Sequence, residues 1–260
     1  MEDIEVEKQM SSMSRRSFVW GGVALVGLVV GRNWLISRED NNGVGYPFRR
    51  ALEFNEAVSR RVFRRDRLAQ SFDKSEAGEP RTNGMEGLAD EVDPNLWRLK
   101  LVGAHGQSEP MEIDLQTIMS LPKHEIVTEL KCIEGWSQVV HWTGARLADF
   151  IEKYPPKTVS GAAPDVKGKP EDLMPYIGIV TPDGGYYVGL ELESALHEQT
   201  LLCYEMNGKP LSSDHGAPIR LAIPVKYGIK NIKRVGTLTY ASAKPADYWA
   251  ERGYDWYAGH

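Results

Sequence analysis

From Asp93 onward, turn residues divide the sequence into short strand-like runs, and this division limits the folds that the chain can adopt. Asn207-Gly208 is the strongest hairpin signal, because both residues accept the positive φ angles of a two-residue turn. Leu201–Met206 and Lys209–Leu211 flank it, and Pro182–Gly185 separates two further runs. The strand-like runs outnumber the helical ones and do not alternate regularly with them. This pattern favours an α+β, mainly β fold over a doubly wound sheet.

Further strands and helices are predicted around these turns. Trp97–Gly103 alternates apolar and polar residues as a half-buried strand does, and Ile126–Cys132 is the next strand-like run. Asp114 is typical of an N-cap for a short helix over Leu115–Ser120, and a second helix is predicted over Thr143–Tyr154. The remaining predicted strands are Tyr176–Thr181, Tyr186–Leu190, Arg220–Val225 and Val235–Tyr240, and an aromatic tail, Tyr248–His260, is expected to pack on the surface.

The composition excludes some classes of protein. The formal net charge of −5 argues against a general nucleic-acid binder, so no nucleic-acid partner is expected. Cys132 and Cys203 are the only two cysteines, which leaves neither a disulfide-dense scaffold nor a structural zinc site built on cysteines. A single disulfide between them stays open for an exported protein. Otherwise Cys203, which lies in the apolar run Leu201–Tyr204, is expected in the core.

The N-terminal region is expected to direct export and to stay outside the folded domain. Arg15-Arg16 precedes an uncharged stretch from Ser17 to Gly31, which is typical of a bacterial twin-arginine signal. An ordinary membrane anchor with flanking arginines is the alternative. No Ala-x-Ala cleavage site follows the stretch, so both cleavage and retention as an anchor stay open. The protein is therefore predicted to be exported. It would be either free in the periplasm or anchored in the membrane with its domain facing the periplasm.

Three segments are predicted along the chain. Residues 1–36 are the signal or anchor, residues 37–92 contain a linker, a basic helix and a segment leading into the domain, and residues 93–260 form the domain itself. The linker is expected at Glu39–Gly45, and the helix at Arg49–Phe72. This helix is rich in arginine, which suits either a solvated face or contact with anionic lipid headgroups.

Cys132 ends a strand-like run and is followed directly by Ile133-Glu134-Gly135-Trp136-Ser137. A thiolate is a strong donor to soft transition metals, and a strand end that meets a glycine-containing turn can point the thiolate into a cleft. An inert buried cysteine is the alternative. Trp136 is expected to pack beneath such a site, and Glu134 is expected to pair with Lys131.

A second segment, from His215 to Lys233, concentrates positive charge in an otherwise acidic protein. Arginine binds phosphate in a bidentate manner, and Gly216 and Gly228 allow a ligand to approach the backbone closely, so this density suggests an anion site. The alternative is that the lysines form the solvent-exposed face of a strand. The four cations are Arg220, Lys226, Lys230 and Lys233.

Together the two segments resemble the molybdopterin-binding domain of the sulfite oxidase family, over about Asp93–Tyr240. The resemblance implies a fold of mixed sheets and short helices. It also implies a mononuclear molybdenum that is held by one pterin dithiolene and by Cys132, which would be both the metal ligand and the catalytic residue. By motif position, the residues implied in cofactor binding are Asn83, Thr181, His215, Arg220, Asn231, Ile232 and Lys233.

The residues after Cys132 indicate the subgroup. They are closer to the Val-Glu-Ala-Trp-Ser of bacterial periplasmic methionine sulfoxide reductase catalytic subunits than to the Ala-Gly-Asn-Arg-Arg of animal and plant sulfite oxidases. The resemblance therefore implies oxygen-atom transfer at a small or protein-bound sulfur-centred substrate, with sulfoxide reduction favoured. Sulfite dehydrogenation and a cofactor-free exported binding module are the alternatives. A monomer is expected, since no segment as large as the sulfite oxidase dimerisation domain follows Tyr240.

A molybdenum oxidoreductase of this kind needs a separate electron carrier. The sequence contains no Cys-x-x-Cys-His haem motif and no set of cysteines for an iron–sulfur cluster. A membrane haem subunit or a soluble cytochrome is therefore expected as the electron partner.

Overall fold

The computed structural model describes residues 2–37, 44–89 and 91–260. Most of the predicted linker, Glu39–Gly45, lies outside these residues. The chain forms two compact units, Met1–Leu52 and Glu53–His260. The functional division at residues 36 and 92 stays a proposal.

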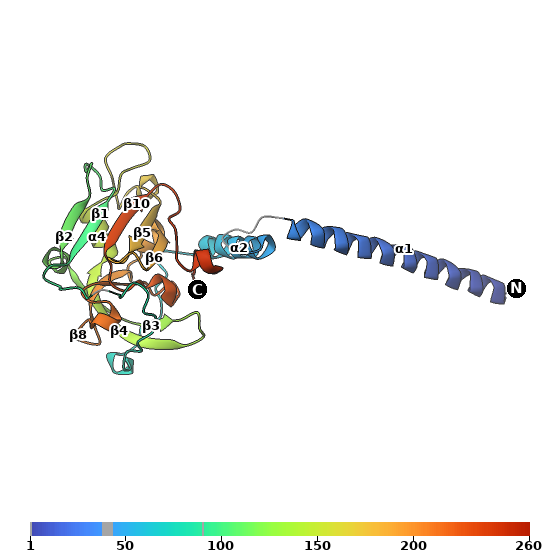
Figure 1. The fold of residues 1–260 in the computed structure, drawn as a ribbon, viewed down its shortest axis with the longest axis horizontal. Coiled ribbons are helices and arrows are strands. Elements are labelled where there is room, and N and C mark those ends of the chain that lie inside the picture. Colours follow the sequence, from blue (N-terminus) through green and yellow to red (C-terminus); the bar gives the residue numbers. More distant parts are fainter. Residues whose placement is uncertain (1, 38–43, 90) are drawn as a thin grey trace. The chain divides into compact units, whose positions relative to one another are not determined.

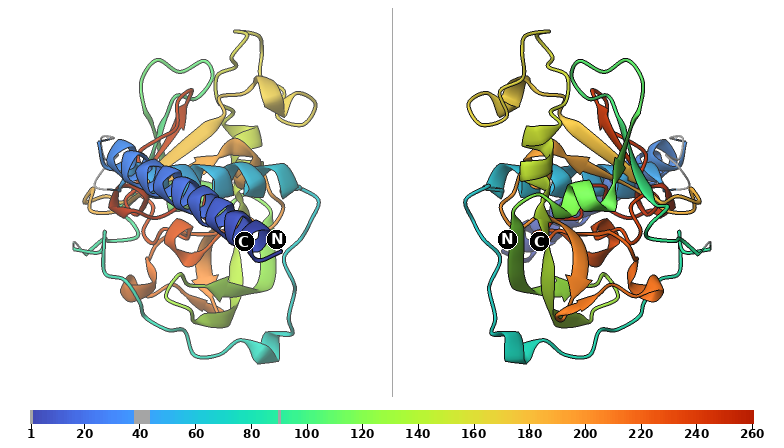
Figure 2. Two further views of the ribbon diagram at one scale, coloured as in Figure 1. Left: turned by 90° about the vertical axis from the view of Figure 1, so that its right-hand side faces the viewer. Right: turned by 90° about the vertical axis from the view of Figure 1, so that its left-hand side faces the viewer.

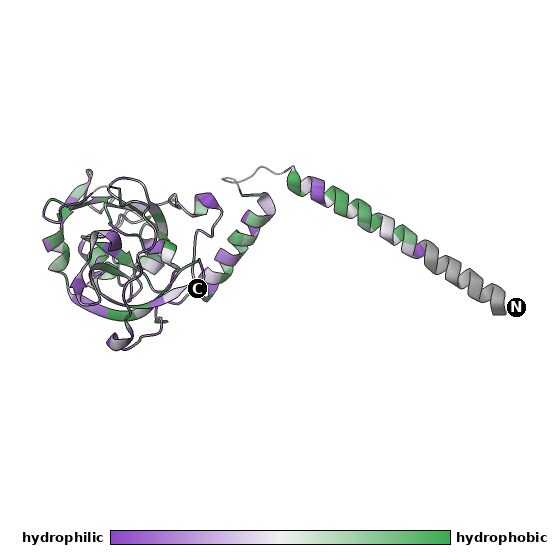
Figure 3. Cartoon of the chain, turned by 60° about the horizontal axis from the view of Figure 1, so that its bottom comes forward, coloured by the Kyte–Doolittle hydropathy of each residue, from purple (hydrophilic) through white to green (hydrophobic). Residues whose placement is uncertain are grey.

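The first unit contains the long helix α1, Glu2–Ile36. Its segment Arg16–Ile36 is long and apolar enough to cross a membrane, a property that signal sequences share. Hydrophobic residues predominate in the coloured part of this helix (Figure 3). The indole of Trp34 packs edge-on against the ring of Tyr46, with 6.1 Å between the ring centroids. These features agree with a signal or an anchor.

Helix α2 covers Tyr46–Val62, so the prediction of a helix reaching Phe72 was wrong at its C-terminal end. Hydrogen bonds to a distant loop hold the chain out of helical geometry beyond Val62. His197 Nε2 bonds to the carbonyl of Arg67 at 3.0 Å, and the side chain of Gln199 accepts from the amide of Ala69 at 2.7 Å. These tertiary contacts override the helical pattern of the sequence.

The second unit is built on two five-stranded sheets, which occupy separate parts of the domain in Figure 1. The first has the order β2-β1-β10-β5-β6, with β1 and β10 parallel and every other pair antiparallel. The second has the order β3-β4-β7-β8, and β9 pairs with β7. The strands are β1 Arg98–Val102, β2 Met111–Asp114, β3 Lys123–Lys131, β4 Ser137–Arg146, β5 Tyr176–Val180, β6 Tyr187–Glu191, β7 Leu201–Met206, β8 Lys209–Pro210, β9 Arg220–Ala222 and β10 Thr237–Ala241.

Short helices connect the strands, so the prediction of an α+β, mainly β fold with mixed sheets and short helices is confirmed. The side chain of Asp114 accepts from the amide of Thr117 at 2.7 Å, as expected of an N-cap. The α-helices are α3 Leu115–Met119, α4 Leu147–Lys153 and α5 Leu192–Ala195, and the 3₁₀ helices are η1 Lys74–Glu76, η2 Pro170–Asp172, η3 Ser213–His215, η4 Gly228–Lys230 and η5 Ala250–Arg252.

The helix predicted over Thr143–Tyr154 begins only at Leu147, because Thr143–Arg146 belong to β4. This strand pairs with β3 on one side and with β7 on the other. A Cβ on Gly144 would lie 2.2 Å from the carbonyl oxygen of Leu202, so this glycine permits the close approach of β7. Pairing on both edges therefore decides the conformation of these residues.

The main hydrophobic core joins side chains of both sheets with helix α4. The aromatic tail also enters the fold, which corrects the prediction that it packs on the surface. Trp256 and Tyr257 are 7% and 3% exposed, and the indole of Trp256 donates to the carbonyl of Pro245 at 2.9 Å. By contrast, the segment between α4 and β5, which contains η2, projects from the domain (Figure 2).

Candidate functional site

Cys132 lies in the turn between β3 and β4. The turn is closed by a hydrogen bond of 2.9 Å from the Cys132 amide to the carbonyl of Trp136. Gly135 takes a φ of 85°, which a glycine adopts without strain. The Cys132 thiol is free and half-buried, and Cys203, also free, is fully buried in the smaller core cluster. The two cysteines therefore form no disulfide, and Cys203 lies in the core as predicted.

Cys132 lines a cavity of about 240 Å³. The cavity gathers residues that are far apart in the sequence, from the segment before β1, the β3–β4 turn, β9, the η4 loop and the aromatic tail. Of the predicted site residues, those that line it are Asn83, Cys132, Arg220, Asn231 and Lys233.

Arg220 places a buried guanidinium in the cavity wall. Its two terminal nitrogens donate to the carbonyls of His215 and Asn231 at 3.1 and 3.2 Å, and the group lies 4.8 Å from the centre of the Trp142 ring. Burial lowers the pKa of Arg220 to about 10. Within the described part of the chain, its Nε has no hydrogen-bond partner. A buried N–H without a partner is costly, so this atom is suited to donating to an anion.

Lys233 brings a second cation to the same wall. Its ammonium donates to the carbonyls of Asn83 and Gly84 at 2.7 and 2.9 Å, and so it ties the segment before β1 to the loop after η4. Burial, and after it the charge of Arg220, lowers the pKa of Lys233 to about 8. An ammonium has three N–H donors, which leaves one for a ligand.

The loop between Gly228 and Lys233 is held rigidly beside the cavity. The side-chain oxygen of Asn231 accepts from the amide of Ile223 at 2.8 Å, and its amide nitrogen donates to the carbonyl of Tyr227 at 3.1 Å. Asn231 therefore positions the loop with its side chain and supports Arg220 with its carbonyl.

Three of the predicted site residues do not line this cavity. Thr181 is buried, and its hydroxyl donates to Asp183 at 2.6 Å while accepting from the amide of Tyr186 at 3.1 Å. Ile232 is 1% exposed in the main core. The carbonyl of His215 accepts a hydrogen bond from Arg220. Burial, followed by the charges of Arg220 and Lys233, lowers the pKa of the His215 ring. A role in cofactor binding for these residues stays a proposal.

Lys226 and Lys230 do not contribute charge to the cavity, which corrects their interpretation as part of the anion site. Lys226 pairs with Glu191 at 2.9 Å, and Lys230 pairs with Asp247 at 2.5 Å. All four side chains are at most 3% exposed. These lysines are therefore internal supports beneath the loop, and of the four cations only Arg220 and Lys233 line the cavity.

Glu134 has a different partner from the one predicted. Its carboxylate accepts from the indole of Trp136 at 2.9 Å and from the side-chain amide of Asn83 at 3.3 Å. Lys131 instead forms an ion pair with Glu129 at 3.8 Å. Trp136 is half-buried and lines the cavity instead of packing beneath it. Glu134 thus links the β3–β4 turn to the segment before β1.

Glu134 also affects the pKa of the Cys132 thiol. Burial raises the pKa of the Cys132 thiol, and the negative charge of Glu134 adds to the effect. We expect Glu134→Gln to lower this pKa and to raise the rate of thiol alkylation at pH 8 by about threefold, since the thiolate is the reactive form. The measurement is the alkylation rate against pH in cofactor-free full-length protein, with Glu129→Gln as the control. An unchanged pH profile in Glu134→Gln would contradict the expectation.

Sequence reasoning missed the aromatic wall of the cavity, which consists of Tyr186, Trp249 and Tyr254 together with Trp136. The hydroxyl of Tyr186 donates to the carbonyl of Ile229 at 2.6 Å, and the rings of Trp249 and Tyr254 are in edge contact with 5.2 Å between centroids. The density of aromatic residues after Tyr248 was the available signal. Arg81 was also missed, and it lies 4.7 Å from the centre of the Trp136 ring.

The residues that line the cavity fit a molybdenum pterin cofactor. Such a group presents a soft metal and a phosphate, and the cavity offers one thiol together with three cations, Arg81, Arg220 and Lys233. The unpartnered Nε of Arg220 is the specific structural sign of a missing acceptor within the described residues. Burial raises the pKa of the Cys132 thiol, so the thiol carries its proton at neutral pH. Binding of a metal would release that proton.

Comparison with known proteins gives the same family. The family model for the oxidoreductase molybdopterin-binding domain matches residues 86–249. The chain is 29% identical over 258 residues to a protein from Azospira oryzae that is provisionally named protein-methionine-sulfoxide reductase subunit YedZ1, covering 98% of this chain and 91% of that protein. It is 28% identical over 192 residues to the protein-methionine-sulfoxide reductase catalytic subunit MsrP of Xanthomonas axonopodis, covering 70% of this chain and 59% of that subunit.

Among solved structures, the sulfane dehydrogenase SoxCD from Paracoccus pantotrophus aligns with 60% of this chain and 41% of its own, at 16% identity and a TM-score of 0.49.

Proposed function

The chain belongs to the family of oxidoreductase molybdopterin-binding domains, and from this premise we propose that it reduces a sulfoxide by oxygen-atom transfer. The observation that carries the proposal is the placement of the Cys132 thiol, Arg220 and Lys233 around one cavity. Two relatives are named as parts of a protein-methionine-sulfoxide reductase, which supports a sulfoxide as the substrate. Because the family is one of oxidoreductases, a cofactor-free binding module is no longer supported.

The cofactor, when bound, would supply a molybdenum centre that exchanges an oxygen atom with the substrate. Cys132 would hold the metal through its thiolate, and the half-buried turn around it would fix the direction of the sulfur. Arg220 and Lys233 would hold the phosphate of the pterin through charge-assisted hydrogen bonds. Asn83 and Asn231 would contact the cofactor from the cavity wall, and Thr181, His215 and Ile232 would support these contacts from behind.

The aromatic wall suits a substrate that carries sulfur on an apolar side chain. Sulfur makes favourable contacts with aromatic ring edges, and Trp136, Trp249 and Tyr254 present rings to the cavity. Tyr254 is 40% exposed, so the wall is open to solvent. In the proposed reaction the sulfoxide S–O bond breaks, and the oxygen leaves as water after the uptake of protons from solvent and of an equal number of electrons.

The electrons would come from a separate redox protein, which we propose to be a membrane haem subunit or a cytochrome. Two relatives are named as subunits, which supports a partner. We also propose that the chain is exported, with α1 acting as a signal or as a membrane anchor. On this view the domain works as a monomer in the periplasm.

Oxidation of sulfite is the second candidate, and one observation favours it. Arg81 brings a further cation to the cavity, and sulfite is a small anion. Electrons would then flow outward to an acceptor. If this candidate holds, Arg81→Gln should raise KM for sulfite by about tenfold, because one charge-assisted hydrogen bond is lost.

A pair of assays on the full chain separates the candidates. The protein is made in a host that synthesises the pterin cofactor, and it is then assayed with peptide methionine sulfoxide plus a reductant, and with sulfite plus an electron acceptor. We expect turnover in the first assay and at most trace turnover in the second. Turnover with sulfite alone would overturn the sulfoxide proposal and leave the family assignment intact.

The pH dependence of cofactor retention tests the role of Lys233. Its pKa is lowered to about 8, so its positive charge is present below this pH and is lost as the pH rises. We expect the loaded enzyme to lose about ten times more pterin during dialysis at pH 9.5 than at pH 7, and Lys233→Arg to lose little at either pH. Released pterin is measured by its fluorescence after oxidation. Equal loss from the wild type at both pH values would contradict the assignment.

A further inference from the structure

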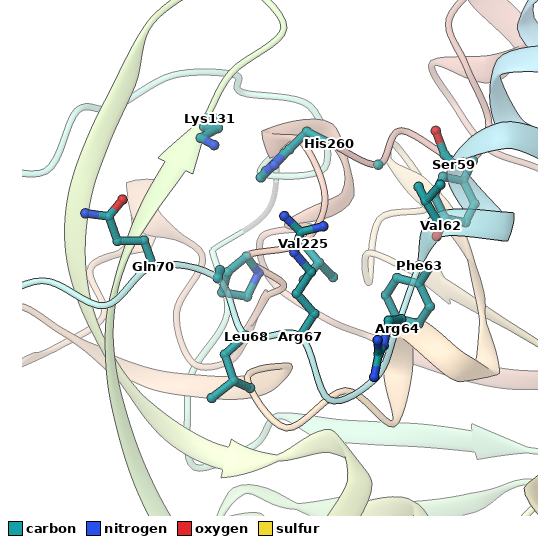
Figure 4. Close-up of a pocket in the computed structure, with 14 residues that line it drawn as sticks. Ser59, Val62, Phe63, Arg64, Arg67, Leu68, Gln70, Lys131, Val225 and His260 are labelled. Atoms are coloured by element: carbon teal, nitrogen blue, oxygen red, sulfur yellow. The ribbon is translucent and has the colours of Figure 1, made fainter.

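The second unit has another cavity, of about 420 Å³ (Figure 4). It shares no lining residue with the first cavity, although Lys131, in its wall, precedes Cys132 in the chain. The cavity is formed by the end of α2, the segment that follows it, the chain before Lys226 and the C-terminal residues. Its lining includes Phe63, Arg64, Arg67, Leu68, Lys131 and His260.

The lining combines positive charge with apolar surface. Two of these cations form ion pairs with carboxylates, Arg64 with Asp66 at 2.9 Å and Lys131 with Glu129 at 3.8 Å. Arg67 belongs to neither of these ion pairs. Figure 4 shows Arg67, Lys131 and His260 around the cavity, with Phe63 at its right and Leu68 below it. Such a mixture fits a ligand that is anionic at one end and apolar at the other.

An independent feature lies beside this cavity on helix α2. Phe54, Val58 and Val62 follow one another at four-residue spacing, which places them on one face of the helix. They are 68%, 46% and 62% exposed. The opposite side is fixed to the domain by Glu56, which accepts from Lys244 at 2.7 Å. The apolar stripe Phe54–Val58–Val62 therefore faces solvent, and its last member also lines the cavity.

An exposed apolar stripe next to arginines is the pattern of a helix that lies in a membrane interface. Arg61, Arg64 and Arg65 are exposed near the end of this helix, and the apolar segment Arg16–Ile36 comes shortly before it in the sequence. We propose that the second cavity binds the phosphate headgroup of an anionic phospholipid, while the stripe Phe54–Val58–Val62 enters the same bilayer surface. The domain would thus be held at the membrane by a contact of its own.

The test uses the full chain in lipid nanodiscs of zwitterionic phosphatidylcholine, with or without phosphatidylglycerol. Hydrogen–deuterium exchange is followed in peptides that cover residues 54–70 and 257–260. We expect these peptides to exchange at least about fivefold more slowly in phosphatidylglycerol nanodiscs than in pure phosphatidylcholine nanodiscs. Arg67→Gln should remove most of this difference, and Lys100→Gln, an exposed lysine on β1, should leave it unchanged.

Further arms identify the source of the anion and the role of the stripe. Inorganic phosphate added to phosphatidylcholine nanodiscs should give little protection, whereas protection equal to that of phosphatidylglycerol would assign the cavity to free phosphate and overturn the proposal. Phe54→Ser with Val58→Ser should weaken protection of residues 54–62. Equal exchange in both lipids, or protection that appears only when an acidic redox partner is added, would also overturn the proposal.

Discussion

Replacing Cys132 by alanine is expected to lower sulfoxide turnover by at least about 100-fold, because it removes the protein sulfur proposed to hold the metal, and loss of partners outside the ligand sphere already costs 10–100-fold. The pterin should remain bound, since Arg220 and Lys233 hold the phosphate on other elements of the fold. X-ray absorption at the molybdenum edge should show the loss of one sulfur neighbour. Activity and pterin content are measured on the same preparation.

Cys203→Ala is the matched control for this experiment. Cys203 is fully buried in the smaller core cluster, so its replacement tests whether the loss of any thiol has the same effect. We expect this variant to keep both pterin and turnover, and Cys132→Ser to lose turnover as Cys132→Ala does. Unchanged turnover in Cys132→Ala would remove the assignment of Cys132 as the metal ligand.

Replacing Lys230 by methionine is expected to lower the free energy of unfolding by about 3–5 kcal/mol, because it leaves the carboxylate of Asp247 buried without its counter-charge. The two side chains are 1% and 2% exposed, and the Lys230 ammonium also donates to the carbonyl of Gly189 at 2.9 Å. Lys230 is the last residue of the η4 helix, and Asn231 and Lys233 follow it in the chain. Pterin content should therefore fall together with stability. Urea unfolding gives the free energy.

Two further variants show whether the buried charge is the cause. Lys123→Met breaks an exposed pair with Glu205, at 3.3 Å, and should cost less than about 1 kcal/mol. Lys230→Met combined with Asp247→Asn should recover part of the lost stability, since no uncompensated charge remains. If Lys230→Met unfolds at the same urea concentration as Lys123→Met, the buried pair does not support the loop as described.

Local signals in the sequence predicted much of the fold. The N-cap at Asp114 and the strands that flank Asn207-Gly208 depend on residues close together in the chain, and the structure contains both. The strand conformation of Thr143–Arg146 depends instead on pairing with β7, which comes from about 60 residues later in the chain. No window of sequence around β4 contains that information.

The candidate site could be predicted in part for the same reason. Cys132, Arg220 and Lys233 stand in segments with recognisable motifs, and the structure places them around one cavity. Lys226 and Lys230 have the same residue type and spacing as anion-binding lysines, but their partners, Glu191 and Asp247, are distant in sequence. Burial of a charge follows from tertiary packing and cannot be read from the residue type alone.

The aromatic density after Tyr248 was visible in the sequence, but its place in the cavity wall was not, because that place depends on where the C-terminal segment returns to the domain. Trp249 and Tyr254 resemble a surface tail in the sequence, yet they line the cavity opened by the β3–β4 turn. The buried anchors Trp256 and Tyr257 fix this return. Only the folded structure shows that these residues line the cavity.

The most direct test is the molybdenum and pterin content of the full chain, purified from a cofactor-producing host grown with excess molybdate. Metal is measured by mass spectrometry, and pterin is measured by fluorescence after oxidation. We expect equal amounts of molybdenum, pterin and protein, with the metal bonded to a cysteine sulfur that is lost in Cys132→Ala. Protein that is correctly folded but contains neither molybdenum nor pterin would contradict this expectation.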